Sequence, residues 1–247
     1  MKTSIATSLL LAGMCLSVSA IAEDKAHWSY SGPEGPEHWG KLAKEFSTCS
    51  TGKNQSPVNL TGMIDGNLAE IKINYKAGGN EIVNNGHTIQ VNYELGSMID
   101  VSGHTFELKQ FHFHSPSENT IEGRSYPMEA HFVHADQEGN LAVIAVMFSE
   151  GKANAELEKT WARMPEQAGD HQALESMVDA GILLPQQHDY YRFNGSLTTP
   201  PCSEGVWWLV MKQVDTVSKE QIEKFAHTIH HPNNRPLQAI NARMVLE

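Results

Sequence analysis

Hydrophobic and polar residues along the chain are arranged mainly in the patterns of β-strands. The segment 82–93, IVNNGHTIQVNY, places β-branched residues around an Asn85-Gly86 turn signal, which predicts a hairpin. Two segments are apolar on both faces, as buried strands are: LAVIAVMF at 141–148 and GVWWLVM at 205–211. Helix signals are fewer and favour amphipathic helices at 154–164 and 218–231. We therefore expect a mostly β fold with short peripheral helices.

The N-terminal segment has the pattern of an export signal. Lys2 is followed by the apolar run IATSLLLAGMCLSV, then by SAIA and the polar stretch EDKAHW. This order predicts a secretory signal peptide over 1–22, cleaved after Ala20 or Ala22. The apolar run is too short to span a bilayer comfortably, so we expect no membrane span after processing. The mature chain, 23–247, is then expected in the periplasm or outside the cell.

Composition narrows the class of protein and its partners. The chain has 247 residues, of which 40% are hydrophobic, enough for one large core in a single domain. Its formal net charge of −11 argues against nucleic acid as a partner. Cleavage of the signal would remove Cys15 and leave two cysteines, Cys49 and Cys202. An even count in an exported protein predicts one disulfide bond between them.

The segment QFHFHSPSE at 110–118 contains an unusual pair of histidines. Side chains alternate between faces in a strand, so Gln110, His112 and His114 share one face, while Phe111 and Phe113 occupy the other. A lone buried histidine usually has a structural role, held by hydrogen bonds. Two histidines on one face repel each other if both are protonated. A shared cation removes this conflict because it binds both rings in their neutral form.

A second strand-like segment, MEAHFVH at 128–134, offers a third imidazole. Glu129 and His131 share one face of it, and His131 completes a set of three if the two strands are neighbours. Three neutral imidazoles with a fourth position open are typical of catalytic zinc. Gln110 and Glu129 each lie two residues from a candidate ligand, on its own face. We expect them to accept hydrogen bonds from the imidazoles and to orient the rings.

These segments together resemble an α-class carbonic anhydrase of the exported bacterial type. QFHFH, EAHFVH and GSLTTPPCSEGVWW carry the resemblance, along with four further motifs: HWSYSGPEGPEHWG (27–40), NQSPVNL (54–60), VNNGH (83–87) and NNRPLQ (233–238). The resemblance covers nearly the whole mature chain. It implies one domain, 23–247, built around a central, largely antiparallel ten-stranded sheet, with Zn²⁺ at the bottom of a cone-shaped cavity.

The resemblance also implies roles for individual residues. The zinc ligands would be three histidines: His112, His114 and His131. Thr198 would accept a hydrogen bond from zinc-bound hydroxide and donate its own proton to Glu118, because an ionised carboxylate only accepts. His87 would carry the released proton to buffer, since histidine titrates near neutral pH. Without the resemblance, Glu118 would be interpreted as a solvated loop carboxylate.

Two walls of the cavity follow from the same resemblance. The apolar wall that holds carbon dioxide would be formed by Val133, Val143, Leu197, Val206 and Trp208. The polar wall that orders a water chain would be formed by Tyr30, Asn85 and Gln90. Gln90 departs from the asparagine that the family more often has. Ser115-Pro116 departs from the Trp-Gly of the best-known animal members, which affects only the expected local packing.

The expected function is the zinc-dependent reversible hydration of carbon dioxide to bicarbonate and a proton, by zinc-hydroxide attack with histidine proton shuttling. Sulfonamides or small anions would inhibit at the open zinc position. Exported bacterial relatives are often dimers, so a homodimer is possible.

Two other interpretations fit parts of the sequence. A cupin-type metal oxygenase also uses His-x-His followed by a glutamate, so that Glu118 would be a fourth ligand to iron or manganese. That interpretation leaves SLTTPP unexplained and expects a histidine on a more distant strand than His131. A non-catalytic binding module is the other alternative, because some carbonic anhydrase relatives have lost their zinc ligands. Nothing in this sequence indicates such a loss.

Overall fold

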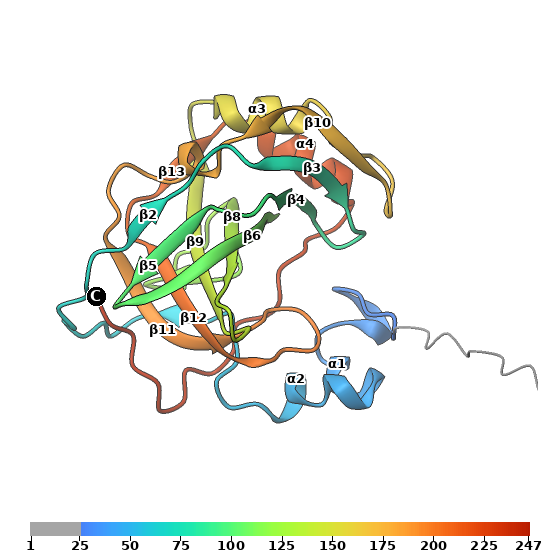
Figure 1. The fold of residues 1–247 in the computed structure, drawn as a ribbon. Helices are drawn as coiled ribbons and strands as arrows, with labels where there is room; N and C mark the ends of the chain where they lie inside the picture. The colour runs from blue at the N-terminus through green and yellow to red at the C-terminus, as the bar shows by residue number, and fades with distance from the viewer. Residues whose placement is uncertain (1–25) are drawn as a thin grey trace, which may run out of the picture.

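The computed structural model describes residues 26–247, so the predicted signal peptide lies outside the described part. Within that range, no helix is both long and apolar enough to cross a membrane. The described chain is organised around one large, twisted sheet with short helices at its margins (Figure 1). The expectation of a mostly β fold with short peripheral helices is thereby confirmed.

The large sheet contains eleven strands among the described residues, where ten are expected. Its main path runs in the order β10 (His171–Val178), β3 (Gly79–Asn84), β4 (Ile89–Tyr93), β6 (His104–His114), β8 (Met128–Ala135), β9 (Leu141–Glu150), β12 (Glu204–Met211) and β11 (Tyr190–Ser196). Three shorter strands join this path from the side: β2 (Lys72–Asn74), β5 (Met98–Val101) and β13 (Asp215–Val217). Pairing is antiparallel except where β12 and β13 run parallel to β9, so the sheet is largely antiparallel as expected.

The remaining elements are short. A separate parallel pair is formed by β1 (Asn59–Leu60) and β7 (Thr120–Ile121). The α-helices are α1 (Trp39–Leu42), α2 (Thr48–Thr51), α3 (Ala155–Trp161) and α4 (Lys219–Ile229). Single 3₁₀ turns occur at Gly32–Glu34, Lys44–Phe46 and Ala180–Leu183. The two helices expected from the sequence correspond to α3 and α4, and both lie at the same margin of the sheet as β10 (Figure 1).

The two faces of β6 meet different surroundings. Phe111 and Phe113 are completely buried in the larger hydrophobic cluster. The ring of Phe113 packs edge-on against Trp161 of α3 and Phe225 of α4, at centroid distances of 5.3 and 6.2 Å. Such aromatic contacts supply both buried area and specific geometry. The helices therefore cover the phenylalanine face and leave the histidine face to the opposite side of the sheet.

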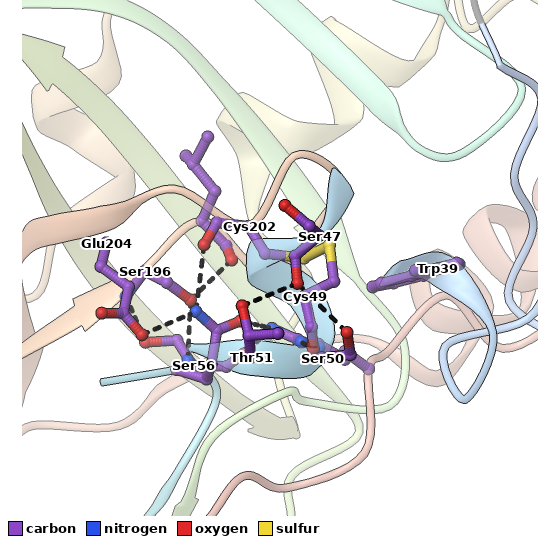
Figure 2. The surroundings of a disulfide bond; sticks show 12 residues. Trp39, Ser47, Cys49, Ser50, Thr51, Ser56, Ser196, Cys202 and Glu204 are labelled. Atoms are coloured by element: carbon purple, nitrogen blue, oxygen red, sulfur yellow. Dashed lines mark hydrogen bonds between the residues drawn. A yellow bond between two sulfur atoms is a disulfide. The ribbon is translucent and has the colours of Figure 1, made fainter. Parts of the chain in front are cut away.

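The predicted disulfide bond is confirmed. Cys49 of α2 is bonded to Cys202, 153 positions away, with 5.0 Å between their Cα atoms. Both cysteines pack with the fully buried Trp39 in a small cluster of their own (Figure 2). Gln55 donates from Nε2 to the carbonyl of Cys202, and Arg235 donates from Nη2 to the carbonyl of Cys49. The bridge thus connects the N-terminal helices to the loop that follows β11.

Candidate metal centre

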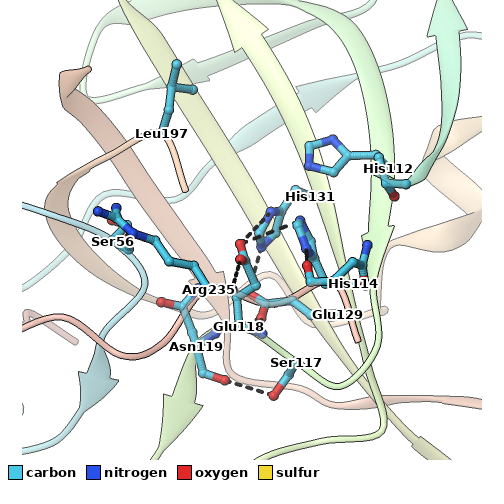
Figure 3. Close-up of polar contacts among 12 residues, drawn as sticks. Ser56, His112, His114, Ser117, Glu118, Asn119, Glu129, His131, Leu197 and Arg235 are labelled. Atoms are coloured by element: carbon cyan, nitrogen blue, oxygen red, sulfur yellow. Dashed lines mark hydrogen bonds and ion pairs between the residues drawn. The ribbon is translucent and has the colours of Figure 1, made fainter. Parts of the chain in front are cut away.

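Strand pairing brings the three candidate imidazoles together. In the antiparallel pair of β6 and β8, His112 lies directly opposite His131, and His114 lies opposite Glu129. Directly opposed residues project to the same face of a sheet. One nitrogen from each of His112, His114 and His131 can be chosen so that all three lie within 4.8 Å of one another. The three rings point into a common space, with Glu118 beside it (Figure 3).

Two of the three rings are oriented by the residues that the sequence suggested. His112 donates from Nδ1 to Oε1 of Gln110 at 2.8 Å, which leaves Nε2 as its lone-pair nitrogen. His131 donates from Nε2 to Oε1 of Glu129 at 2.8 Å, which leaves Nδ1. Glu129 is completely buried and also accepts hydrogen bonds from Asn119 and from the backbone N–H of Glu118. The carboxylate that holds His131 is therefore itself firmly held.

The third ring is oriented by a group that the sequence did not suggest. His114 donates from Nδ1 to the backbone carbonyl of Asn233 at 2.7 Å. The side chain of Asn233 is buried, and it fastens this carbonyl by bonding to the backbone of Ser115, Phe113 and His87. The only sequence signal was that Asn233 opens NNRPLQ, one of the motifs that carry the family resemblance.

Burial keeps the three imidazoles neutral. It lowers the pKa of His112 and His131 well below the usual value for histidine, and it also lowers the pKa of His114. The neighbouring rings reinforce the effect, because a proton on one disfavours a proton on the next. The inward nitrogen of His114, Nε2, is buried without a hydrogen-bond partner in the described part of the chain. Three neutral nitrogen donors, one of them an unpaired buried atom, fit a zinc ion.

Glu118 lies beside the imidazoles and is buried rather than solvated. Its Oε1 accepts a hydrogen bond from the backbone N–H of Arg235 at 2.8 Å, and its Oε2 lies 3.5 Å from Nε2 of His114. Burial raises the pKa of Glu118 to about 8, while the Arg235 N–H and the Thr198 hydroxyl act to lower it. Thr198 is itself buried. The structure therefore places the Thr198 hydroxyl close to Glu118, and Glu118 beside His114.

His87 lies at a partly exposed turn between β3 and β4, against an aromatic surface. Its ring stacks on Trp28, with centroids 3.7 Å apart and planes inclined by 9°, and Tyr30 lies edge-on at 6.5 Å. Burial, helped by the positive charges of His27 and His231, lowers the pKa of His87 to about 4. A neutral ring at pH 7 is the consequence.

The other two residues expected in the polar wall, Asn85 and Gln90, lie in a turn and on a strand, respectively. Asn85 is exposed, and its Oδ1 accepts from the backbone N–H groups of His87 and Thr88, so it closes the turn that carries His87. Gln90 lies directly opposite His112 in the pairing of β4 with β6, on the face of the metal centre.

The five residues expected in the apolar wall belong to one hydrophobic cluster, on the opposite side of the sheet from α3 and α4. Of these five residues, three are buried (Val143, Val206 and Trp208) and two are partly buried (Val133 and Leu197). Trp208 packs edge-on against the ring of His131 at 4.8 Å and donates from Nε1 to the carbonyl of Ser196. The structure thus places apolar side chains directly against the histidine set.

Comparison with known proteins decides the family. The sequence model for "Eukaryotic-type carbonic anhydrase" matches residues 34–247, most of the chain. The chain belongs to the α-class carbonic anhydrase family. It is 53% identical over 241 residues to a carbonic anhydrase of Neisseria gonorrhoeae, a match that covers 97% of this chain and 94% of the relative. It is 46% identical to a carbonic anhydrase of Pectobacterium carotovorum along the full length of both.

Solved structures agree with this assignment. A hyperthermostable carbonic anhydrase from a hydrothermal vent chimney is 57% identical, with a TM-score of 0.88 over 90% of this chain and 99% of its own. The α-carbonic anhydrase of Thermovibrio ammonificans, solved with the inhibitor sulfanilamide, is 50% identical, with a TM-score of 0.89 over 90% of this chain and all of its own. The chain is therefore an enzyme of the carbonic anhydrase class, and the cupin-type interpretation of HFHSPSE is wrong.

Proposed function

We propose that this chain catalyses the zinc-dependent, reversible hydration of carbon dioxide to bicarbonate and a proton, in the periplasm or outside the cell. The observation that carries the proposal is that the two nitrogens of each imidazole have different roles. One nitrogen of His112, His114 and His131 donates to a fixed acceptor, and the other faces the shared space. Oriented, neutral imidazoles are what a catalytic zinc site requires.

The bound metal would be held by Nε2 of His112, Nε2 of His114 and Nδ1 of His131. A zinc ion there supplies Lewis acidity that activates a water molecule near neutral pH, a property for which carbonic anhydrases are the standard example. A cation among the rings also favours the ionised form of Glu118, because an opposite charge opposes the effect of burial. Ionised Glu118 only accepts, so the hydroxyl of Thr198 donates to it and keeps its oxygen free to accept from the reacting water.

The apolar cluster would form the surface against which the uncharged substrate binds. Carbon dioxide has no hydrogen-bond donor, and the surface of Val143, Val206 and Trp208 beside His131 offers contact without competition from bound water. Sulfonamides and small anions would bind at the open metal position, as the sulfanilamide complex of the structural neighbour suggests.

His87 would transfer the released proton. The stacking of its ring on Trp28 supports a gated transfer, in which the ring must move away before it accepts the proton. Burial of the ring is the main cause of its low pKa. When the ring leaves Trp28, burial decreases and the pKa rises toward the neutral range in which proton transfer is most efficient. Tyr30 and Gln90 would line the water path between His87 and the metal. Export by the N-terminal signal and formation of a homodimer are further predictions.

The decisive test combines metal analysis with kinetics. Purified mature protein should contain one zinc ion per chain by elemental analysis and should hydrate carbon dioxide in a stopped-flow assay. The His112→Ala variant should lose most of the zinc and nearly all activity, since a three-ligand site has no spare donor. His104→Ala, which removes an exposed histidine from the same strand, is the matched control and should keep both.

Other outcomes would contradict the proposal. Iron or manganese in place of zinc would refute the metal assignment, and a zinc-loaded protein without hydration activity would favour the binding module. A His112→Ala variant that keeps zinc and turnover would show that His112 is not a ligand.

A further inference from the structure

A row of polar side chains crosses the sheet from its edge to the metal centre. His171 of β10 donates from Nδ1 to Oε1 of Glu81 on β3 at 2.8 Å. The other carboxylate oxygen of Glu81 accepts from Nδ2 of Asn92 on β4 at 2.6 Å. Asn92 in turn accepts, through Oδ1, from Nε2 of Gln90 at 2.7 Å. Four residues are thus linked by three hydrogen bonds of 2.6–2.8 Å.

All members of this row project to the face that carries the metal centre. Glu81 lies opposite Asn92 in the pairing of β3 with β4, and Gln90 lies opposite His112 in the pairing of β4 with β6. Asn92 lies opposite Gln110, the residue that orients His112. Opposed residues share a face, so the row runs alongside the histidine set rather than behind it.

The donors and acceptors in this row determine whether the oxygen or the NH₂ of each amide faces its neighbour. Hydrogen bonds from Asn92 and His171 hold the pKa of Glu81 below its ordinary value, so the carboxyl is ionised at neutral pH and can only accept. The group of Asn92 that meets it must therefore be the NH₂, which turns Oδ1 toward Gln90. Because Oδ1 can only accept, Gln90 must present its NH₂ to Asn92. The Gln90 oxygen is then turned away from Asn92 and is free to accept a hydrogen bond from water.

We propose that Glu81 is a positioning residue for proton transfer: through Asn92, it holds the Gln90 amide with the oxygen toward the water of the active-site cavity. This inference rests on the proposed function, in which Gln90 lines the path between the metal and His87. A fixed acceptor gives the water chain one direction of hydrogen bonding. An amide that is free to turn over would present donor and acceptor in alternation and would interrupt the chain in part of the molecules.

The Glu81→Gln variant tests this inference, because an amide at position 81 can meet Asn92 with either end. In weak buffer, kcat should fall by about five-fold, the factor expected for one lost orienting hydrogen bond. The ratio kcat/KM and the zinc content should stay at the wild-type level, since Glu81 lies on β3 and is separated by β4 from the strand that carries His112 and His114. Glu94→Gln is the matched control, because Glu94 also accepts from an asparagine amide, that of Asn80, but lies off the row.

A second substitution separates orientation from charge and from general damage. In the double variant Glu81→Gln with Asn92→Asp, the new carboxylate at 92 accepts from the amides at both 81 and 90. The orientation of Gln90 is then restored, and kcat should return to within about two-fold of wild type.

Three results would overturn the inference: an unchanged kcat in Glu81→Gln, an equal loss in Glu94→Gln, or no recovery in the double variant when thermal unfolding shows it to be folded. Failure of the proposed function is distinct from all of these. It would appear as absent zinc or absent hydration in the wild-type protein.

Discussion

Asn233 is the residue whose replacement most directly tests how the metal centre is built. Its backbone carbonyl orients His114, and its side chain fixes that carbonyl to the sheet. Oδ1 accepts from the N–H of Ser115 at 2.8 Å, and Nδ2 donates to the carbonyls of Phe113 and His87 at 2.9 and 3.0 Å. Asn233→Ala removes all three hydrogen bonds and leaves every candidate ligand in the chain.

The structure allows the size of the effect to be worked out. The carbonyl of Phe113 keeps a second partner, the hydroxyl of Thr88, so it is not left unpaired. The N–H of Ser115 and the carbonyl of His87 lose the partner that Asn233 gave them. Both groups are partly buried. An unpaired group shielded from water costs about 1–3 kcal/mol, so the free energy of unfolding should fall by about 2–6 kcal/mol. A loosened carbonyl should also weaken zinc binding by about 10- to 100-fold through His114.

Two measurements separate these effects. Urea denaturation of the metal-free protein gives the change in the free energy of unfolding, and competition with a chelator gives the zinc affinity. Asn234→Ala is the matched control, because its side chain is only partly buried and the change removes the same amide one position further on. If Asn233→Ala matches Asn234→Ala in both measurements, the side chain of Asn233 does not hold the carbonyl that orients His114.

Four further predictions follow from other contacts. His87→Ala should keep zinc while kcat falls, and concentrated imidazole buffer should restore part of it; unchanged turnover in weak buffer would exclude His87 as the proton carrier. Glu118→Gln should keep zinc and lose turnover, because an amide NH₂ can face the Thr198 hydroxyl; full activity would refute the relay. Reduction of the bond between Cys49 and Cys202 should lower Tm by several degrees, since closing so long a loop stabilises by at most about 5 kcal/mol, and an equal Tm with and without reductant would contradict this. Burial lowers the pKa of His134 to about 4, so the unfolded chain binds a proton there between pH 6.5 and 4 that the folded chain does not. His134 alone should therefore contribute a decrease in stability of about 3 kcal/mol over that fall in pH, and the His134→Gln variant should lose less than the wild type by about that amount, as measured by urea denaturation at each pH.

The parts of the site that lie on strands could be predicted from the sequence. Alternation along β6 places His112 and His114 on one face and two phenylalanines on the other, and the buried cluster confirms that division. Gln110 and Glu129 were predictable for the same reason, because a residue two positions from a histidine on a strand projects beside it. The fold class followed from the apolar runs, whereas the expected strand count came from the family resemblance and was one too low.

The parts that depend on irregular segments could not be predicted in this way. The acceptor for His114 is a backbone carbonyl, and every residue carries one, so no residue type marks it. Glu118 illustrates a different limit. Spacing alone could not show that the loop after β6 is buried against Arg235, and burial is what separates a solvated carboxylate from one that faces the imidazoles. The orientation of the Gln90 amide depends on Glu81, a strand away, so it too needed the register of the sheet.

The hydrogen bond between His114 and Asn233 joins positions that are 119 residues apart. Because synthesis proceeds from the N-terminus, the three histidines leave the ribosome long before that acceptor exists. Until then the ring of His114 can turn over and offer either nitrogen, so a metal ion captured by the growing chain would meet a ligand of undefined geometry. The finished coordination sphere therefore cannot form before the segment that carries Asn233 has packed against β6, and discrimination between metal ions belongs to the completed protein rather than to the nascent chain.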